Sequence, residues 1–133
     1  SLTAAKLVGC KNTFDVDLVN RDNEKYMIRS GSLKLEVENY KSFSSSRLTA
    51  GIHAHDLSIG REIITSQPNS YLCEIIDSIK GVFSDTLIVK CEGHVLQVNV
   101  SKNISKDIMK EKKQAYYLNF PSDKIFLMNE NNG

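Results

Sequence analysis

Apolar and polar residues alternate with a period of two through much of the chain. Residues 14–18, 33–37, 48–54, 87–91 and 96–100 each place an apolar side chain at nearly every second position. Successive side chains of an extended strand point to opposite faces, so this pattern predicts strands with one buried face. Three further segments have strand-like composition: Tyr26–Arg29, Tyr71–Ile79 and Ala115–Asn119.

Turn and helix signals complete the secondary-structure prediction. The pair Glu92-Gly93 predicts a two-residue hairpin turn because glycine accepts a positive φ, and Ser30-Gly31 predicts a second turn. One or two short helices are expected: a short turn over residues 4–8, and a helix that starts at Asn103 or Ser105 and ends near Lys110. Many short strands with little helix indicate an all-β barrel or sandwich.

A weak internal repeat predicts two related halves. The strand 48–52 continues into His-Ala-His-Asp, and the strand 115–119 continues into Phe-Pro-Ser-Asp. In both places an aspartate follows the strand and precedes a short apolar tail, where it can cap a turn. We therefore expect one half over residues 1–59 and a second over residues 60–133.

Composition excludes several classes of function. The 133 residues suffice for one domain with a normal core, and 17 basic against 16 acidic residues leave a net charge of +1. Without a basic groove, binding of nucleic acid by an OB-type barrel is not favoured. Three cysteines at positions 10, 73 and 91 fit neither a disulfide framework nor a metal knuckle, which indicates reduced thiols in the cytoplasm.

Catalytic motifs are absent from the sequence. No glycine is followed by lysine, so a phosphate-binding Walker A loop cannot be written, and neither G-x-G-x-x-G nor G-x-S-x-G occurs. His53, His55 and Asp56 suggest either metal ligands or the polar end of a strand. We favour the strand end, because no third ligand shares the face of the two histidines. We expect no enzyme activity and no metal site in this chain.

The segment Thr65-Ser66-Gln67-Pro68-Asn69-Ser70 has two interpretations. Short hydroxyl and amide side chains, together with free backbone N–H groups, can form a nest for an oxyanion. The same residues are common in any polar loop that precedes a strand. Composition by itself favours the ordinary loop.

Three segments together resemble a known family. Residues 5–12 (AKLVGCKN) resemble the junction after the nucleotide-binding domain in molybdate- and sulfate-type ABC importer ATPases. Residues 51–57 (GIHAHDL) resemble the G-I-R-x-E-[DH]-[IL] corner of their accessory domain, with His53 in place of the arginine. Residues 117–128 (YLNFPSDKIFLM) resemble its closing strand. The resemblance implies a TOBE domain, which is an OB-like β-barrel of two related halves.

The resemblance also implies a function and partners. Such a domain is a regulatory and dimerisation module of the ATPase subunit, here for an oxyanion such as molybdate, tungstate or sulfate, with weak effector binding. Its expected partners are a second copy of the subunit, an upstream nucleotide-binding domain that holds ATP and Mg²⁺, and the importer's membrane subunits at the inner face of the cell membrane. No cofactor is expected in this segment. The alternative is a stand-alone oxyanion storage or sensor protein.

The family pattern carries an oxyanion site over to specific positions. It assigns ligands to Ser66, Gln67 and Asn69 in the loop, and to Ser101 and Ser122 further along the chain. Pro68 and Pro121 stand where molybdate-binding relatives have an arginine and a lysine. Two lost charge-assisted contacts, at about 1.5–3 kcal/mol each, would weaken the site by roughly 3–6 kcal/mol. Two alternatives remain: a weak site made of hydroxyl and backbone groups, or a site in which Lys102 substitutes for the lost cations.

Overall fold

The computed structural model describes residues 11–22, 24–38, 42–63, 68–111 and 115–129. The prediction of an all-β fold is confirmed, with α2 as the helix of the described part of the chain. The helix expected over residues 4–8 lies outside the described residues. The elements in chain order are β1 (Lys11–Asp22), β2 (Lys25–Ser30), β3 (Leu33–Glu38), β4 (Arg47–His53), β5 (Ser58–Gly60), β6 (Ser70–Ile79), β7 (Ser84–Cys91), β8 (His94–Ser101), α2 (Lys102–Glu111), β9 (Ala115–Asn119) and β10 (Phe126–Asn129).

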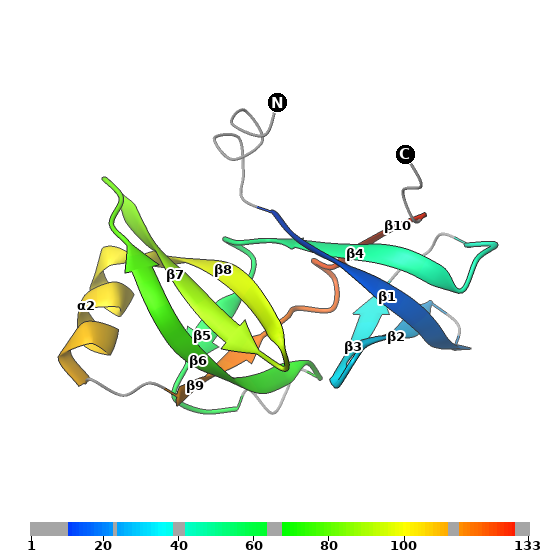
Figure 1. Cartoon of the computed structure of the whole chain (residues 1–133), viewed down its shortest axis with the longest axis horizontal. Coiled ribbons are helices and arrows are strands. Elements are labelled where there is room, and N and C mark those ends of the chain that lie inside the picture. The colour runs from blue at the N-terminus through cyan, green and yellow to red at the C-terminus, as the bar shows by residue number, and fades with distance from the viewer. Residues whose placement is uncertain (1–10, 23, 39–41, 64–67, 112–114, 130–133) are drawn as a thin grey trace.

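The strands form two curled antiparallel sheets that lie side by side (Figure 1). The first sheet has the order β10-β4-β1-β2-β3, and the second has the order β5-β9-β6-β7-β8. Each contains a three-strand meander whose first strand carries a bulge, between Leu18 and Asn20 in β1 and between Ile75 and Asp77 in β6. Bulges increase local twist, which helps a small sheet curl into a barrel. The two predicted halves are therefore related in structure.

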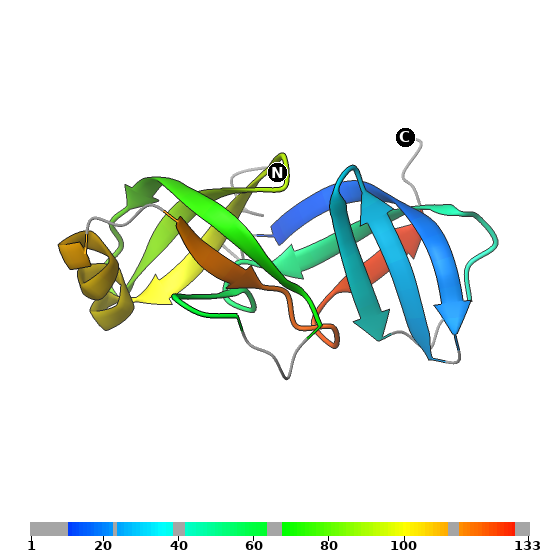
Figure 2. The ribbon, with the colours of Figure 1, turned by 90° about the horizontal axis from the view of Figure 1, so that it is seen from below.

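The two sheets exchange short strands, and here the structure differs from the predicted division. β5 spans the expected boundary between residues 59 and 60 and pairs with β9 of the second sheet. β10 returns from the second half to pair with β4 of the first sheet. Figure 2 shows this crossing at the centre of the molecule. Neither sheet is one continuous segment, because each half supplies its last strand to the other.

Gly51 is required where β10 crosses β4. Gly51 and Phe126 are register partners, and a Cβ on Gly51 would lie 2.3 Å from a carbon of the Phe126 ring. The phenylalanine ring therefore covers the space that a side chain at position 51 would need. The arrangement is an aromatic residue packed over a strand glycine.

The core follows the alternation seen in the sequence. In β3 and β7 every second residue is buried, and Ile28, Leu48 and Leu118 are fully buried in other strands. The predicted β7–β8 turn is confirmed, with φ of 48° at Glu92 and 83° at Gly93. Among the described residues, no helix is long and apolar enough to cross a membrane.

Candidate functional site

The structure separates the predicted oxyanion ligands into two groups. Asn69 precedes β6, whereas Ser101 at the end of β8 pairs with Ser84, close to the other end of β6. Ten residues of strand at about 3.3 Å each put roughly 30 Å between these ends. A single oxyanion cannot be bound by both groups. Ser66 and Gln67 lie outside the described residues.

The side chain of Asn69 closes the junction between the two sheets. Asn69 is 2% exposed. Its Nδ2 donates to the carbonyl oxygens of Glu36 at 2.7 Å and Phe120 at 3.0 Å. Its Oδ1 accepts from the Glu36 N–H at 2.9 Å. All three bonds are to backbone groups, and Glu36 lies on the edge strand β3. Asn69 therefore acts as a one-residue extension of the sheet, and its amide is not available to an oxyanion.

Asn12 makes the reciprocal contact from the first sheet. Its Nδ2 donates to the Gln97 carbonyl at 2.9 Å and its Oδ1 accepts from the Gln97 N–H at 2.8 Å, on the edge strand β8. Each half thus places one buried asparagine against the edge of the other half. Ser122 belongs to the same junction, since its carbonyl accepts from the Glu38 N–H at 3.0 Å and its side chain is half-buried.

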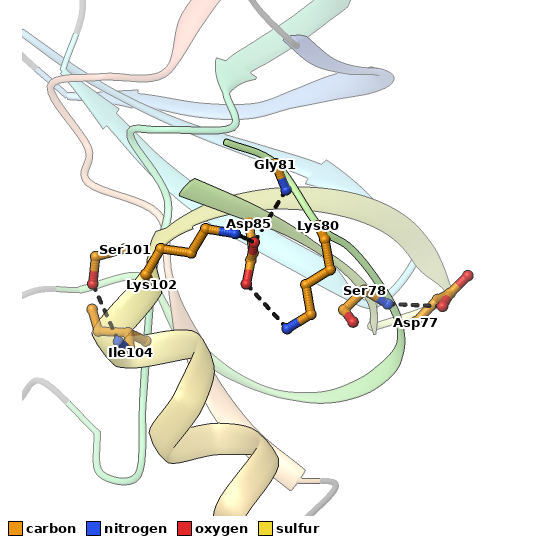
Figure 3. Close-up of polar contacts among 8 residues, drawn as sticks. All are labelled: Asp77, Ser78, Lys80, Gly81, Asp85, Ser101, Lys102 and Ile104. Carbon is orange, nitrogen blue, oxygen red and sulfur yellow. Dashed lines mark hydrogen bonds and ion pairs between the residues drawn. The ribbon is translucent and has the colours of Figure 1, made fainter. Parts of the chain in front are cut away.

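Lys102 and Ser101 lie in a second cluster at the start of α2 (Figure 3). The Nζ of Lys102 donates to Asp85, whose carboxylate also accepts from Lys80 Nζ at 3.3 Å and from the Gly81 N–H at 3.1 Å. The side chain of Asp85 is only 1% exposed. Ser101 Oγ accepts from the Ile104 N–H at 3.2 Å and so caps the helix.

The Asp85 cluster already contains an anion supplied by the protein. The ammonium group of Lys102 holds the pKa of Asp85 well below the usual range, although burial acts in the opposite direction. Lys102 therefore already has an anionic partner within the chain, which it shares with Lys80. Lys102 does not replace the cations missing at Pro68 and Pro121.

Sequence reasoning missed Asp85, although a signal was present. Asp85 stands in register with Leu87, Val89 and Cys91, which are the inward positions of β7. An aspartate on the buried face of a strand needs a partner, because an unpaired buried carboxylate is strongly unfavourable. The alternation identified this face, but only the fold shows that one lysine from the β6–β7 turn and one from α2 reach it.

The histidines at the end of β4 stack on each other. The rings of His53 and His55 lie 5.3 Å apart at 18°, and His55 Nε2 is 3.7 Å from Asp56 Oδ1. Among the described residues, no three histidine, cysteine or acidic side chains are placed to hold one metal ion. The pair is the polar end of a strand that packs beside Phe126.

The two described cysteines are buried thiols. Burial raises the pKa of Cys73 to about 11 and that of Cys91 to about 12. Both are free, and both face the core from β6 and β7. Thiols that stay protonated at neutral pH are poor nucleophiles, so their geometry supports a packing role.

A cleft of about 530 Å³ lies between α2 and the segment that follows β5. Arg61 Nε donates to Glu111 Oε1 at 2.8 Å across it, and burial followed by the charge of Glu111 raises the pKa of Tyr116 at its base. Three carboxylates and one guanidinium border the cleft, so its potential disfavours an oxyanion. Its lining residues are Ile59, Gly60, Arg61, Glu62, Ile104, Asp107, Ile108, Glu111 and Tyr116.

Comparison with known proteins supports the fold. The chain matches no family model, and no curated protein matches its sequence. Among solved structures it is similar to the cytoplasmic molybdate-binding protein ModG in a crystal form with molybdate bound. The TM-score is 0.74 at 11% identity, over 91% of this chain and 97% of that chain. The OB-like barrel of two related halves is thereby confirmed.

Proposed function

We propose that this chain is an accessory domain of the ATP-binding subunit of an oxyanion importer, with a regulatory and self-associating role and no catalysis of its own. The observation that carries the proposal is the fold shared with ModG over 91% of the chain. The three segments that resemble importer ATPases add the connection to transport. The domain would act at the cytoplasmic face of the membrane, joined to an ATP-binding domain and working with the membrane subunits.

In this proposal, the oxyanion effector binds weakly at the junction between the sheets. Ser122 presents a half-buried hydroxyl there, next to the backbone that Asn69 fixes. Pro68 and Pro121 supply neither a cation nor an N–H donor. A site with a Kd of about 1 µM that loses roughly 3–6 kcal/mol is left with a Kd between about 0.1 mM and about 20 mM. Such a site would respond only to a high concentration of the transported anion.

Equilibrium dialysis with molybdate, tungstate and sulfate tests this role. We expect binding with a Kd between about 0.1 mM and about 20 mM, and a further loss in Ser122→Ala. The matched control is Ser101→Ala, which removes a helix cap at the distant cluster and leaves oxyanion binding unchanged. Absence of any binding at saturating anion, with Ser122→Ala identical to the parent chain, would reject the effector role. In the intact subunit, deletion of this domain should leave ATP hydrolysis in place and remove its response to the anion.

The alternative is a stand-alone oxyanion-binding protein. This alternative is favoured by the extent of the match, since this fold covers 97% of the ModG chain and leaves little of that protein outside it. Micromolar or tighter binding in the same dialysis experiment would favour storage or sensing over regulation.

A further inference from the structure

The two halves of the chain provide an internal comparison. The bulges of β1 and β6 align Leu18 with Ile75 and Asn20 with Asp77. The same alignment pairs the buried asparagines, since Asn12 and Asn69 contact the edge strand of the opposite sheet in the same way. Equivalent positions in the two sheets therefore have the same backbone environment, and differences between their side chains are not required by the fold.

The outer faces of the two equivalent strands differ in polarity. On β6 the outward residues Leu72, Ile76 and Ile79 are 56%, 49% and 56% exposed, and the outward Glu74 lies between the first two. The equivalent positions on β1 are Asp15, Val19 and Asp22, so two of these three positions are acidic. Three large apolar side chains on one face, against one on the equivalent face, indicate a binding surface, because the fold itself tolerates polar residues there.

The β6–β7 turn, which directly follows β6, carries two more exposed apolar side chains. Val82 is 83% exposed and Phe83 is 91% exposed. The turn is anchored, because the buried carboxylate of Asp85 accepts from the Gly81 N–H and pairs with Lys80 (Figure 3). Because the turn is already fixed, Val82 and Phe83 lose little backbone entropy when they bind a partner. Such a contact is preorganised.

The β6 apolar row is defined by five residues: Leu72, Ile76, Ile79, Val82 and Phe83. It contains five of the eleven exposed large apolar residues among those that the structure describes. Two of the charged residues near it balance, since Glu74 stands opposite Lys90 across the strands. A neutral apolar face does not repel its own copy, whereas an acidic or basic face would.

We propose that the β6 apolar row is the contact through which two copies of this chain associate. The described surface offers no second row of this kind, so the apolar complement in another molecule of this chain is the same row. A twofold arrangement brings the row against itself, so that both copies supply the same residues to the contact. This proposal deepens the self-association in the proposed function and locates it, but it rests on the exposure pattern and not on oxyanion binding.

Sedimentation velocity of the whole chain between about 1 and about 300 µM tests the contact, since this range covers weak specific association. We expect a reversible dimer in the parent chain. Ile76→Glu should raise the dimer Kd at least about tenfold, as for a central interface residue. The matched control is Val19→Glu, which places the same charge at the equivalent bulge of β1 and should leave the dimer unchanged.

Phe83→Ser provides a second variant, because a residue that is 91% exposed does not support the core and the variant will fold. It should also weaken the dimer, with an unchanged melting curve. A parent chain that stays monomeric, an unaffected Ile76→Glu dimer, or equal effects of Ile76→Glu and Val19→Glu would each overturn the proposal. So would a monomer that sediments with vesicles of phosphatidylcholine and phosphatidylglycerol. Molybdate dialysis on the same samples tests the proposed function separately. Failure of the dimer contact changes the sedimentation result, whereas failure of the proposed function changes the anion-binding result.

Discussion

Replacing Asn69 with alanine tests whether the buried asparagines hold the two sheets together. The substitution removes three hydrogen bonds, two donated and one accepted by the asparagine amide. The N–H and carbonyl of Glu36 and the carbonyl of Phe120 each lose that bond. At about 0.5–1.5 kcal/mol each, with Glu36 partly open to water, the free energy of unfolding should fall by about 2–4 kcal/mol. Urea unfolding followed by circular dichroism measures this loss as a lower midpoint concentration of urea with an unchanged m-value.

Two control variants sharpen that experiment. Asn12→Ala removes two bonds of the same kind and should cost about 1–3 kcal/mol. Asn20→Ala removes only a local bond to the exposed N–H of Arg21 and should change stability by less than about 0.5 kcal/mol. Asn69→Asp should be at least as damaging as alanine at neutral pH, since a carboxylate would face two carbonyl oxygens. If Asn69→Ala is no more destabilising than Asn20→Ala, the asparagine does not connect the sheets.

Three further predictions concern other parts of the molecule. The pKa of Asp85 is lower in the folded chain than in the unfolded chain, so its ionised form stabilises the fold. This stability is present above the ordinary aspartate pKa of about 3.9 and is lost as pH falls further. The free energy of unfolding should therefore fall less in acid for Asp85→Asn than for the parent, and equal acid titration curves would refute this. Cys73 and Cys91 should resist alkylation by iodoacetamide at neutral pH until urea unfolds the chain, because burial raises their pKa values to about 11 and about 12. Mass spectrometry of digests measures the labelling. Rapid labelling of either thiol in the folded chain would contradict their burial. Glu92→Asn should stabilise the β7–β8 turn by up to about 1 kcal/mol, because asparagine tolerates the φ of 48° better than glutamate. Thermal unfolding measures the change. A loss of stability would show that the hydrogen bond from Ser32 to the Glu92 carboxylate matters more.

The candidate site was only partly predictable from sequence. The resemblance selected Asn69 and Ser122, and the structure brings both to the junction, but it uses the amide of Asn69 to satisfy the backbone of a strand more than thirty residues away in sequence. Lys102 was expected to meet an external anion, and it meets Asp85 instead. Such contacts join segments whose separation in space is set by strand pairing, which no local pattern records.

The sequence alone determined the all-β class, most of the strands and their inward faces, because burial of one face of a strand imposes a period of two on the residues themselves. It also showed that the chain repeats. Only the tertiary structure decided that β5 and β10 cross between the sheets, because strands of three and four residues carry too little pattern to specify a partner. β10 pairs with β4 and β5 pairs with β9, and β4 and β9 are the strands that extend the two meanders. The same crossing brings the buried asparagines of each half within reach of the other.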